Sequence, residues 1–136
     1  MSGVKIDMVI RGISCMVAGI EGYTDNITIT SIVGRFLEHS RIYIFGKGKT
    51  AKIYISSADF MTRNTIRRVE VATPVYDDGI RERILRMFNT MLSDNVKARI
   101  MANDGNYYKK DAADGVSRLN SQEYFYDEVV KKAQQN

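Results

Sequence analysis

A length of 136 residues suits one compact domain, and 44% hydrophobic residues can form a buried core. No apolar run approaches the ~20 residues that a membrane-spanning helix needs. The single cysteine, Cys15, excludes an intrachain disulfide. The net charge of +4 is unevenly placed, because residues 35–68 contain eight Lys or Arg residues and two acidic ones. This local surplus favours an anionic partner, although a solvated basic face would have the same composition.

The first third of the chain has the pattern of two strands separated by a loop. Apolar and polar residues alternate over residues 4–10, which predicts the first strand. Residues 11–26 contain three glycines and predict a loop, and the β-branched run over 27–33 predicts the second strand. Because a strand begins almost at residue 1, we expect an N-terminally truncated domain.

Residues 39–56 predict a β-hairpin. Its strands would cover residues 39–45 and 52–56, joined by a turn that contains Gly46 and Gly48. Side chains alternate between the faces of a strand. One face of the first strand would therefore carry His39, Arg41 and Tyr43.

The second half of the chain adds helices. Asp77 or Asp78 can cap a helix over residues 80–92, whose apolar face we expect to pack on a sheet. Asn120, with Glu123 three residues later, resembles a capping box that begins the last helix. Shorter patterns predict a strand over 69–73 stopped by Pro74, a strand over 96–101, a turn at 104–106 and a surface loop over 109–118. Strands mixed with helices indicate an α/β fold.

Phosphate chemistry is the function that the hairpin residues suggest first. His39 is the only histidine of the chain, and Arg41 would lie beside it. An imidazole can transfer a proton near neutral pH or attack phosphorus, while a guanidinium grips phosphate oxygens. A lone histidine on a strand is, however, more often structural.

Two further groups of polar residues are candidates for the same site. Arg11 directly follows the first strand, where side chains of an α/β sheet often reach a ligand, although it would also suit a surface salt bridge. Residues after the hairpin could lie next to His39 or merely form a polar loop, with Asp59 neutralising an arginine. These candidates are Ser56, Ser57, Asp59, Arg63 and Asn64. Cys15 is expected to be a small buried residue.

Taken together, these segments resemble the C-terminal part of the long bacterial polyphosphate kinases. The resemblance is carried by residues 4–13, by SIVGRFLEHSRI at 31–42 and by YISSAD at 54–59, followed by Met61, Arg63 and Asn64. Residues 68–71, 94–99 and 120–123 extend it through nearly the whole chain.

The resemblance implies a phospholipase-D-like mixed β-sheet flanked by helices, with residues 1–136 forming one C-terminal catalytic domain of a larger kinase. It implies reversible transfer of the ATP γ-phosphate to inorganic polyphosphate through a phosphohistidine. By resemblance, His39 is the second active-site histidine, which contacts phosphate and acts as acid or base. Arg11 matches a nucleotide-phosphate arginine, and Arg41 stands where phospholipase-D motifs carry lysine.

Other parts of the implied site lie outside this chain. The phosphorylated histidine, the arginines linked to Mg²⁺ and a tyrosine that contacts adenine belong by resemblance to a preceding domain. We therefore expect the isolated chain to be inactive. The resemblance also implies ATP or ADP, polyphosphate and the remaining kinase domains as partners, a homo-oligomer, and a cytoplasmic location with peripheral membrane association also allowed; it implies no nucleic acid.

Two alternatives stay open. The first is a phospholipase-D-type phosphodiesterase half-site completed by dimerisation, although the aspartate of that motif is absent. Ser57 and Asp59 are similar to the motif's distal Ser-x-Asn. The second is a non-catalytic module that binds polyanions.

Overall fold

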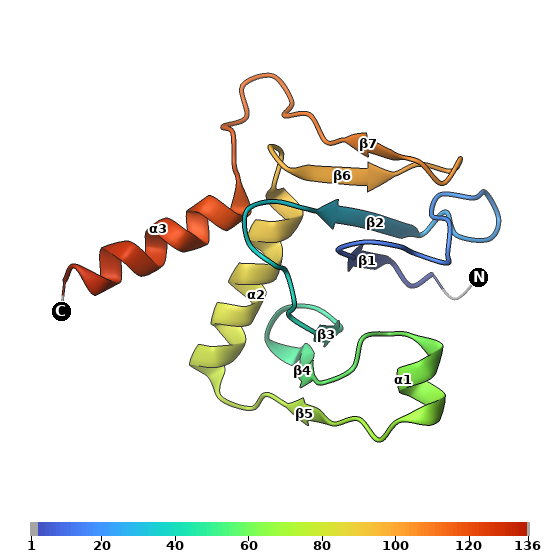
Figure 1. Cartoon of the computed structure of the whole chain (residues 1–136), viewed down its shortest axis with the longest axis horizontal. Helices are drawn as coiled ribbons and strands as arrows, with labels where there is room; N and C mark the ends of the chain where they lie inside the picture. Colours follow the sequence, from blue (N-terminus) through green and yellow to red (C-terminus); the bar gives the residue numbers. More distant parts are fainter. Residues whose placement is uncertain (1–2, 136) are drawn as a thin grey trace. The chain divides into compact units, whose positions relative to one another are not determined.

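The computed structural model describes residues 3–135 and divides into two compact units (Figure 1). The larger unit combines the residues up to Glu38 with those from Phe88 onward, and the smaller unit is His39–Met87. This division does not test the prediction that residues 1–136 form one domain, which stays a prediction. Within residues 3–135, no helix is long and apolar enough to span a membrane.

The larger unit is built on a four-stranded sheet in the order β1-β2-β6-β7 (Figure 1). Strands β1 (Ile6–Val9) and β2 (Ile27–Ile32) are parallel, and β6 (Ala98–Met101) and β7 (Tyr107–Lys109) continue the sheet with antiparallel pairing. The β-branched run of β2 fits this central position, because residues 29–32 are all buried. A cluster around Ala18, Ile29 and Met101 forms the core.

Asp94 joins three elements of the larger unit. The side chain is fully buried at the end of α2 (Asp78–Ser93). Its Oδ1 accepts the backbone N–H groups of residues 96–98, just before and at the start of β6. Its Oδ2 accepts the N–H and hydroxyl of Ser121, the first residue of α3 (Ser121–Ala133). Burial opposes the charge, but these hydrogen bonds outweigh it and lower the pKa of the Asp94 carboxyl.

The smaller unit contains a three-stranded antiparallel sheet in the order β3-β4-β5. Strands β3 (Ile42–Phe45) and β4 (Lys52–Ser56) form the predicted hairpin, and the 3-10 turn η1 (Gly48–Thr50) lies between them. Gly46 and Gly48 have φ angles of 89° and 59°, a region that glycine enters without steric cost. The edge strand β5 (Ala72–Pro74) and helix α1 (Thr62–Arg67) complete the unit.

Arg81, near the start of α2, connects this helix by hydrogen bonds to other segments of the smaller unit. Its guanidinium donates to the backbone carbonyls of Lys49, Ala51 and Val75 at 3.0, 2.7 and 3.2 Å. Asp77 caps the same helix, because its Oδ1 accepts the N–H of Ile80 at 2.8 Å.

The structure confirms most of the predicted elements and corrects several details. The predicted strand over 39–45 begins only at Ile42, so His39 and Arg41 precede it. Pro74 lies inside β5 rather than after it, because an edge strand can lack one backbone donor. Cys15 is exposed, not buried. On the apolar face of α2, Met91 is buried but Ile80 is half exposed, so only part of that face is packed.

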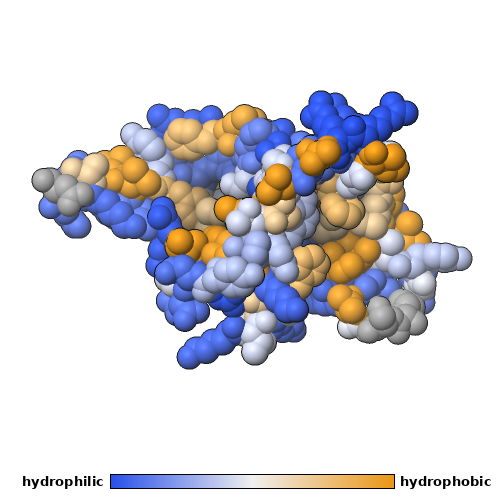
Figure 2. Space-filling view, turned by 90° about the horizontal axis from the view of Figure 1, so that it is seen from below, coloured by the Kyte–Doolittle hydropathy of each residue, from blue (hydrophilic) through white to orange (hydrophobic). Residues whose placement is uncertain are grey.

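Both units expose large apolar side chains. Figure 2 shows such residues, in orange, scattered among hydrophilic ones on the face that it presents. Ile13, Val33 and Leu37 of the larger unit are well exposed, as are Phe60 and Val69 of the smaller unit. Exposure on this scale is typical of surfaces that contact another protein segment.

Candidate functional site

His39, Arg41 and Asp59 form a contiguous hydrogen-bonded row in the smaller unit, which we call the His39 cluster. The Nη2 atom of Arg41 lies 2.6 Å from Nε2 of His39. On its other side, Arg41 Nε donates to Asp59 Oδ1 at 2.9 Å, and Nη2 lies 3.4 Å from Oδ2. The predicted pairing of imidazole and guanidinium is therefore present. The alternative role of Asp59, neutralising an arginine, is present as well.

Asp59 orients the Arg41 guanidinium and favours its charged form. The side-chain hydrogen bond from Arg41 to Asp59 is the largest effect on the pKa of Arg41, which it raises above its ordinary value. The Arg41 side chain is 22% exposed and that of Asp59 is 40% exposed, so water reaches the pair. The backbone of Arg41 is also held, since its carbonyl accepts the N–H of Ser56 at 2.9 Å.

The segment that carries Asp59 is fixed by bonds to its own backbone. Asn64, which is only 5% exposed, donates from Nδ2 to the Asp59 carbonyl at 3.0 Å. The hydroxyl of Tyr43 donates to the Ala58 carbonyl at 3.1 Å. Asn64 is therefore a buried residue that holds the backbone of the loop at Asp59, and it does not face solvent. Its Oδ1 has no hydrogen-bond partner among residues 3–135.

The two predicted serines form hydrogen bonds within the same loop and to the segment before β5, and their expected position next to His39 stays a prediction. Ser56 Oγ donates to the Val71 carbonyl and accepts the N–H of Ala58. Ser57 Oγ donates to the Glu70 carboxylate and accepts the N–H of Val71. Both hydroxyls thus connect the loop to Glu70 and Val71, the residues just before β5.

Arg63, the remaining predicted residue of the smaller unit, is exposed on α1. Its side chain forms no hydrogen bond or ion pair with residues 3–135. It therefore adds positive charge to the unit without supporting the loop.

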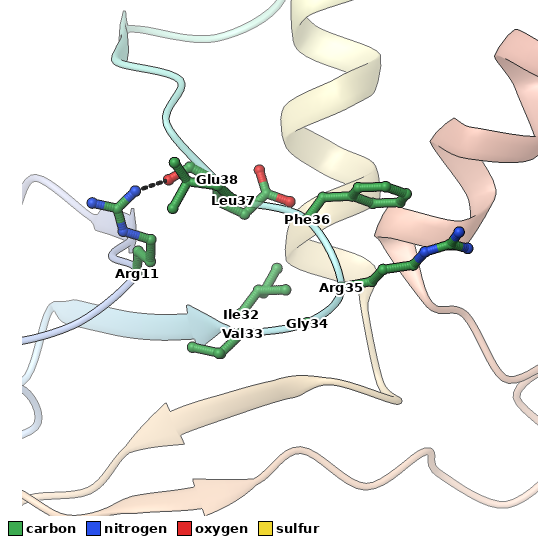
Figure 3. A pocket seen from close by; sticks show the side chains of 8 residues that line it. All are labelled: Arg11, Ile32, Val33, Gly34, Arg35, Phe36, Leu37 and Glu38. Atoms are coloured by element: carbon green, nitrogen blue, oxygen red, sulfur yellow. Dashed lines mark hydrogen bonds between the residues drawn. The ribbon is translucent and has the colours of Figure 1, made fainter.

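Arg11 belongs to the larger unit, where it lines a pocket of about 220 Å³ together with residues 32–38 (Figure 3). Its Nη1 donates to the backbone carbonyl of Glu38 at 2.8 Å, as the dashed line in Figure 3 marks. This bond fixes one edge of the guanidinium and leaves the rest of it exposed. Arg11 thus has the freedom to bind an anion. Its expected convergence with His39 and Arg41 on one phosphate stays a prediction.

Gln122 of α3 holds the wall of this pocket, an arrangement that we call the Gln122 clamp. Its Nε2 donates to the Phe36 carbonyl and to Glu38 Oε1, both at 2.8 Å, and its Oε1 accepts the N–H of Phe36 at 2.9 Å. Gln122 is 3% exposed. Sequence reasoning gave it no role, because 86 residues separate Gln122 from Phe36.

Arg35, which also lines the pocket, contacts neighbouring side chains. Its guanidinium carbon lies 5.1 Å from the ring centres of both Phe36 and Tyr126. The Nη1 atom of Arg35 lies 3.9 Å from a carboxylate oxygen of Glu123. These contacts are typical of a packing role.

An exposed imidazole beside a guanidinium is suited to binding a phosphate-like oxyanion, and here the pair is part of a mixed α/β protein. The family model "Polyphosphate kinase C-terminal domain 2" matches residues 1–122. The chain belongs to this family, and the predicted resemblance is confirmed.

Relatives and a solved structure agree with the family. A polyphosphate kinase of Staphylococcus epidermidis is 49% identical over 96% of this chain, and one of Lactiplantibacillus plantarum is 48% identical over 94%. The crystal structure of polyphosphate kinase from Porphyromonas gingivalis matches 98% of the chain with a TM-score of 0.88 and 36% identity. This match confirms the mixed α/β fold. The chain spans only 17%, 18% and 20% of these three proteins, respectively.

Proposed function

We propose that this chain is the C-terminal catalytic part of a polyphosphate kinase that reversibly transfers the ATP γ-phosphate to inorganic polyphosphate. The observation that carries the proposal is the 2.6 Å contact between His39 and Arg41, in a chain that belongs to the polyphosphate kinase family. A guanidinium stabilises the negative charge of a migrating phosphoryl group, and an imidazole can exchange a proton with it.

In this proposal, Arg11 and Arg41 bind phosphate oxygens. His39 contacts the phosphate and acts as an acid or base. His39 is the only histidine of this chain, and the proposal gives it the role of acid or base. The phosphohistidine therefore forms on a histidine outside this chain. The full enzyme has a phospholipase-D-like arrangement, works as a homo-oligomer and is cytoplasmic. The exposed apolar residues of both units support contacts with its remaining domains.

Mg²⁺ is part of the same proposal, and it would neutralise phosphate charge when bound. Within residues 3–135, no group of three or more His, Cys, Asp or Glu side chains is arranged to hold a metal ion. The chain's own residues therefore do not fit a magnesium site, and we derive no step through the ion.

A chimera tests the proposal directly. This chain would replace the matching segment of the Staphylococcus epidermidis relative, and ATP-dependent polyphosphate synthesis would be measured. We expect synthesis by the chimera, a loss of at least about 100-fold for His39→Ala because a positioned acid or base typically contributes that much, and little change for the exposed control Asp114→Asn. Full activity of the His39→Ala chimera would overturn the role of His39.

The isolated chain separates the alternatives. We expect it to turn over no substrate. Phosphodiester hydrolysis by the chain alone would favour the phosphodiesterase half-site. Tight binding of duplex DNA with a steep salt dependence would favour the polyanion module.

A further inference from the structure

The contact between Arg41 and His39 fixes which ring nitrogen of His39 carries a proton. A guanidinium has five N–H donors and no acceptor. At 2.6 Å from Arg41 Nη2, the Nε2 atom of His39 therefore accepts the bond with its lone pair. A neutral imidazole that makes this contact carries its single N–H proton on Nδ1.

Asp59 makes this arrangement directional. It takes up Nε of Arg41 and the side of Nη2 that faces the carboxylate, which leaves the second Nη2 hydrogen pointed at His39. Asp59 is itself held through the bond from Asn64 to its carbonyl. The Nη1 group of Arg41 has no hydrogen-bond partner among residues 3–135, so it can bind an anion while Nη2 keeps its contact with His39.

The lone pair on Nε2 is the one that would have to attack phosphorus if the ring were phosphorylated there. While Arg41 occupies it, that attack is blocked. Nδ1 carries the proton, so its lone pair belongs to the ring π-system and is not nucleophilic. The same geometry leaves Nδ1–H as a hydrogen-bond donor.

We propose that Arg41, oriented by Asp59, holds His39 in the Nδ1-protonated tautomer, so that His39 donates to phosphate through Nδ1–H and is protected from becoming a phosphohistidine. Asp59 is then a positioning residue that acts through Arg41. The assignment rests on the proposed function for its phosphate ligand, but the tautomer can be measured without any enzymatic activity.

Nuclear magnetic resonance gives a direct test, because the chain has one histidine. The full chain, labelled with ¹⁵N-histidine and free of a histidine tag, would give one imidazole spin system. Long-range ¹H–¹⁵N spectra at pH 8 should show a protonated Nδ1 and an unprotonated Nε2. This is the reverse of the tautomer that a histidine side chain free in water prefers.

Variants identify what causes the tautomer. Arg41→Met removes the donor and should return the signals to the Nε2-protonated pattern. Asp59→Ala should shift them in the same direction, and Asp59→Glu should restore the wild-type pattern in part. Asp114→Asn, an exposed change outside the cluster, should leave the pattern unchanged, and amide spectra would verify that each variant is folded. A predominantly Nε2-protonated wild type would overturn the inference, and an unchanged tautomer in folded Asp59→Ala would overturn the role of Asp59.

A chemical phosphorylation assay gives a second measurement. Phosphoramidate transfers its phosphoryl group to an imidazole: the P–N bond of the reagent breaks, a bond from the ring nitrogen to phosphorus forms, and ammonia leaves. We expect wild-type His39 to resist this reaction and Arg41→Met to form phosphohistidine, detected by ³¹P spectra. Equal reactivity of the two would contradict the protection by Arg41. If the chimera makes polyphosphate but the tautomer is not as stated, only this inference fails.

Discussion

Removing the amide of Gln122 should loosen the wall of the Arg11 pocket. Gln122→Ala removes three hydrogen bonds of 2.8–2.9 Å, two to the Phe36 backbone and one to the Glu38 carboxylate. At about 0.5–1.5 kcal/mol for each bond, the expected loss is about 1.5–4.5 kcal/mol of unfolding free energy. That is a large part of the ~5–15 kcal/mol typical of a domain.

Urea unfolding followed by far-ultraviolet circular dichroism measures the loss, since the chain has no tryptophan. Amide hydrogen exchange adds a local readout, because the Phe36 N–H is bonded to Gln122 and should lose protection. Gln134→Ala, at the exposed end of α3, is the matched control and should change neither measurement. A loss below about 0.5 kcal/mol, less than one such bond contributes, with an unchanged Phe36 amide would refute the reasoning.

Three other predictions concern separate features. A Cβ added at Gly34 would collide with the Gln122 amide oxygen, so Gly34→Ala should lower the stability of the chain in urea unfolding. In a chain that already carries Gln122→Ala, the same substitution should cost much less. If the losses from the two substitutions simply add, the contact is contradicted. Hydrogen bonds lower the pKa of Asp94 in the folded chain. Its contribution to stability is therefore fully present above about pH 3.9, the ordinary pKa of an aspartate, and is lost as the pH falls through the lowered pKa of the folded state. Asp94→Asn should be less stable at pH 7 and show a weaker acid dependence; unfolding curves at pH 7 and pH 3 check this, and an unchanged acid dependence would rule it out. Arg81→Ala leaves three backbone carbonyls without their donor and should cost about 3 kcal/mol in urea unfolding, whereas an unchanged midpoint would show that water replaces those bonds.

Elements with strong local signals could be predicted from the sequence. The β-branched run of β2 and the alternating hairpin of β3 and β4 agree with the structure to within a few residues. The caps Asp77 and Asn120 were identified because their side chains bond to N–H groups only three residues away. Such contacts are visible in a short window of sequence.

Elements without local signals were missed. Helix α1 has six residues, begins after Met61 with no side-chain cap, and exposes Ile66, so neither its start nor an apolar face marks it. Strand β7 has three residues, of which Lys109 was assigned to a surface loop and the other two to no element. Both depend on contacts with the rest of their units, which local propensity does not encode.

The site could be predicted in its residue types but not in its geometry. His39 and Arg41 are neighbours because they are two residues apart, whether or not they lie in a strand. The arrangement of Asp59 with Arg41 depends on how the hairpin returns, and so do the bonds of Ser56 and Ser57 to Val71 and Glu70. Long-range pairing of this kind leaves no spacing pattern.

The Gln122 clamp also has a consequence for the order in which the protein folds. Closing a contact over 86 residues costs chain entropy, and nothing nearer in sequence supplies the same three bonds to Phe36 and Glu38. During synthesis, the segment leading to His39 is therefore complete long before α3 emerges to hold it. The wall of the Arg11 pocket that Phe36 and Glu38 form would therefore reach its final position among the last parts of the larger unit.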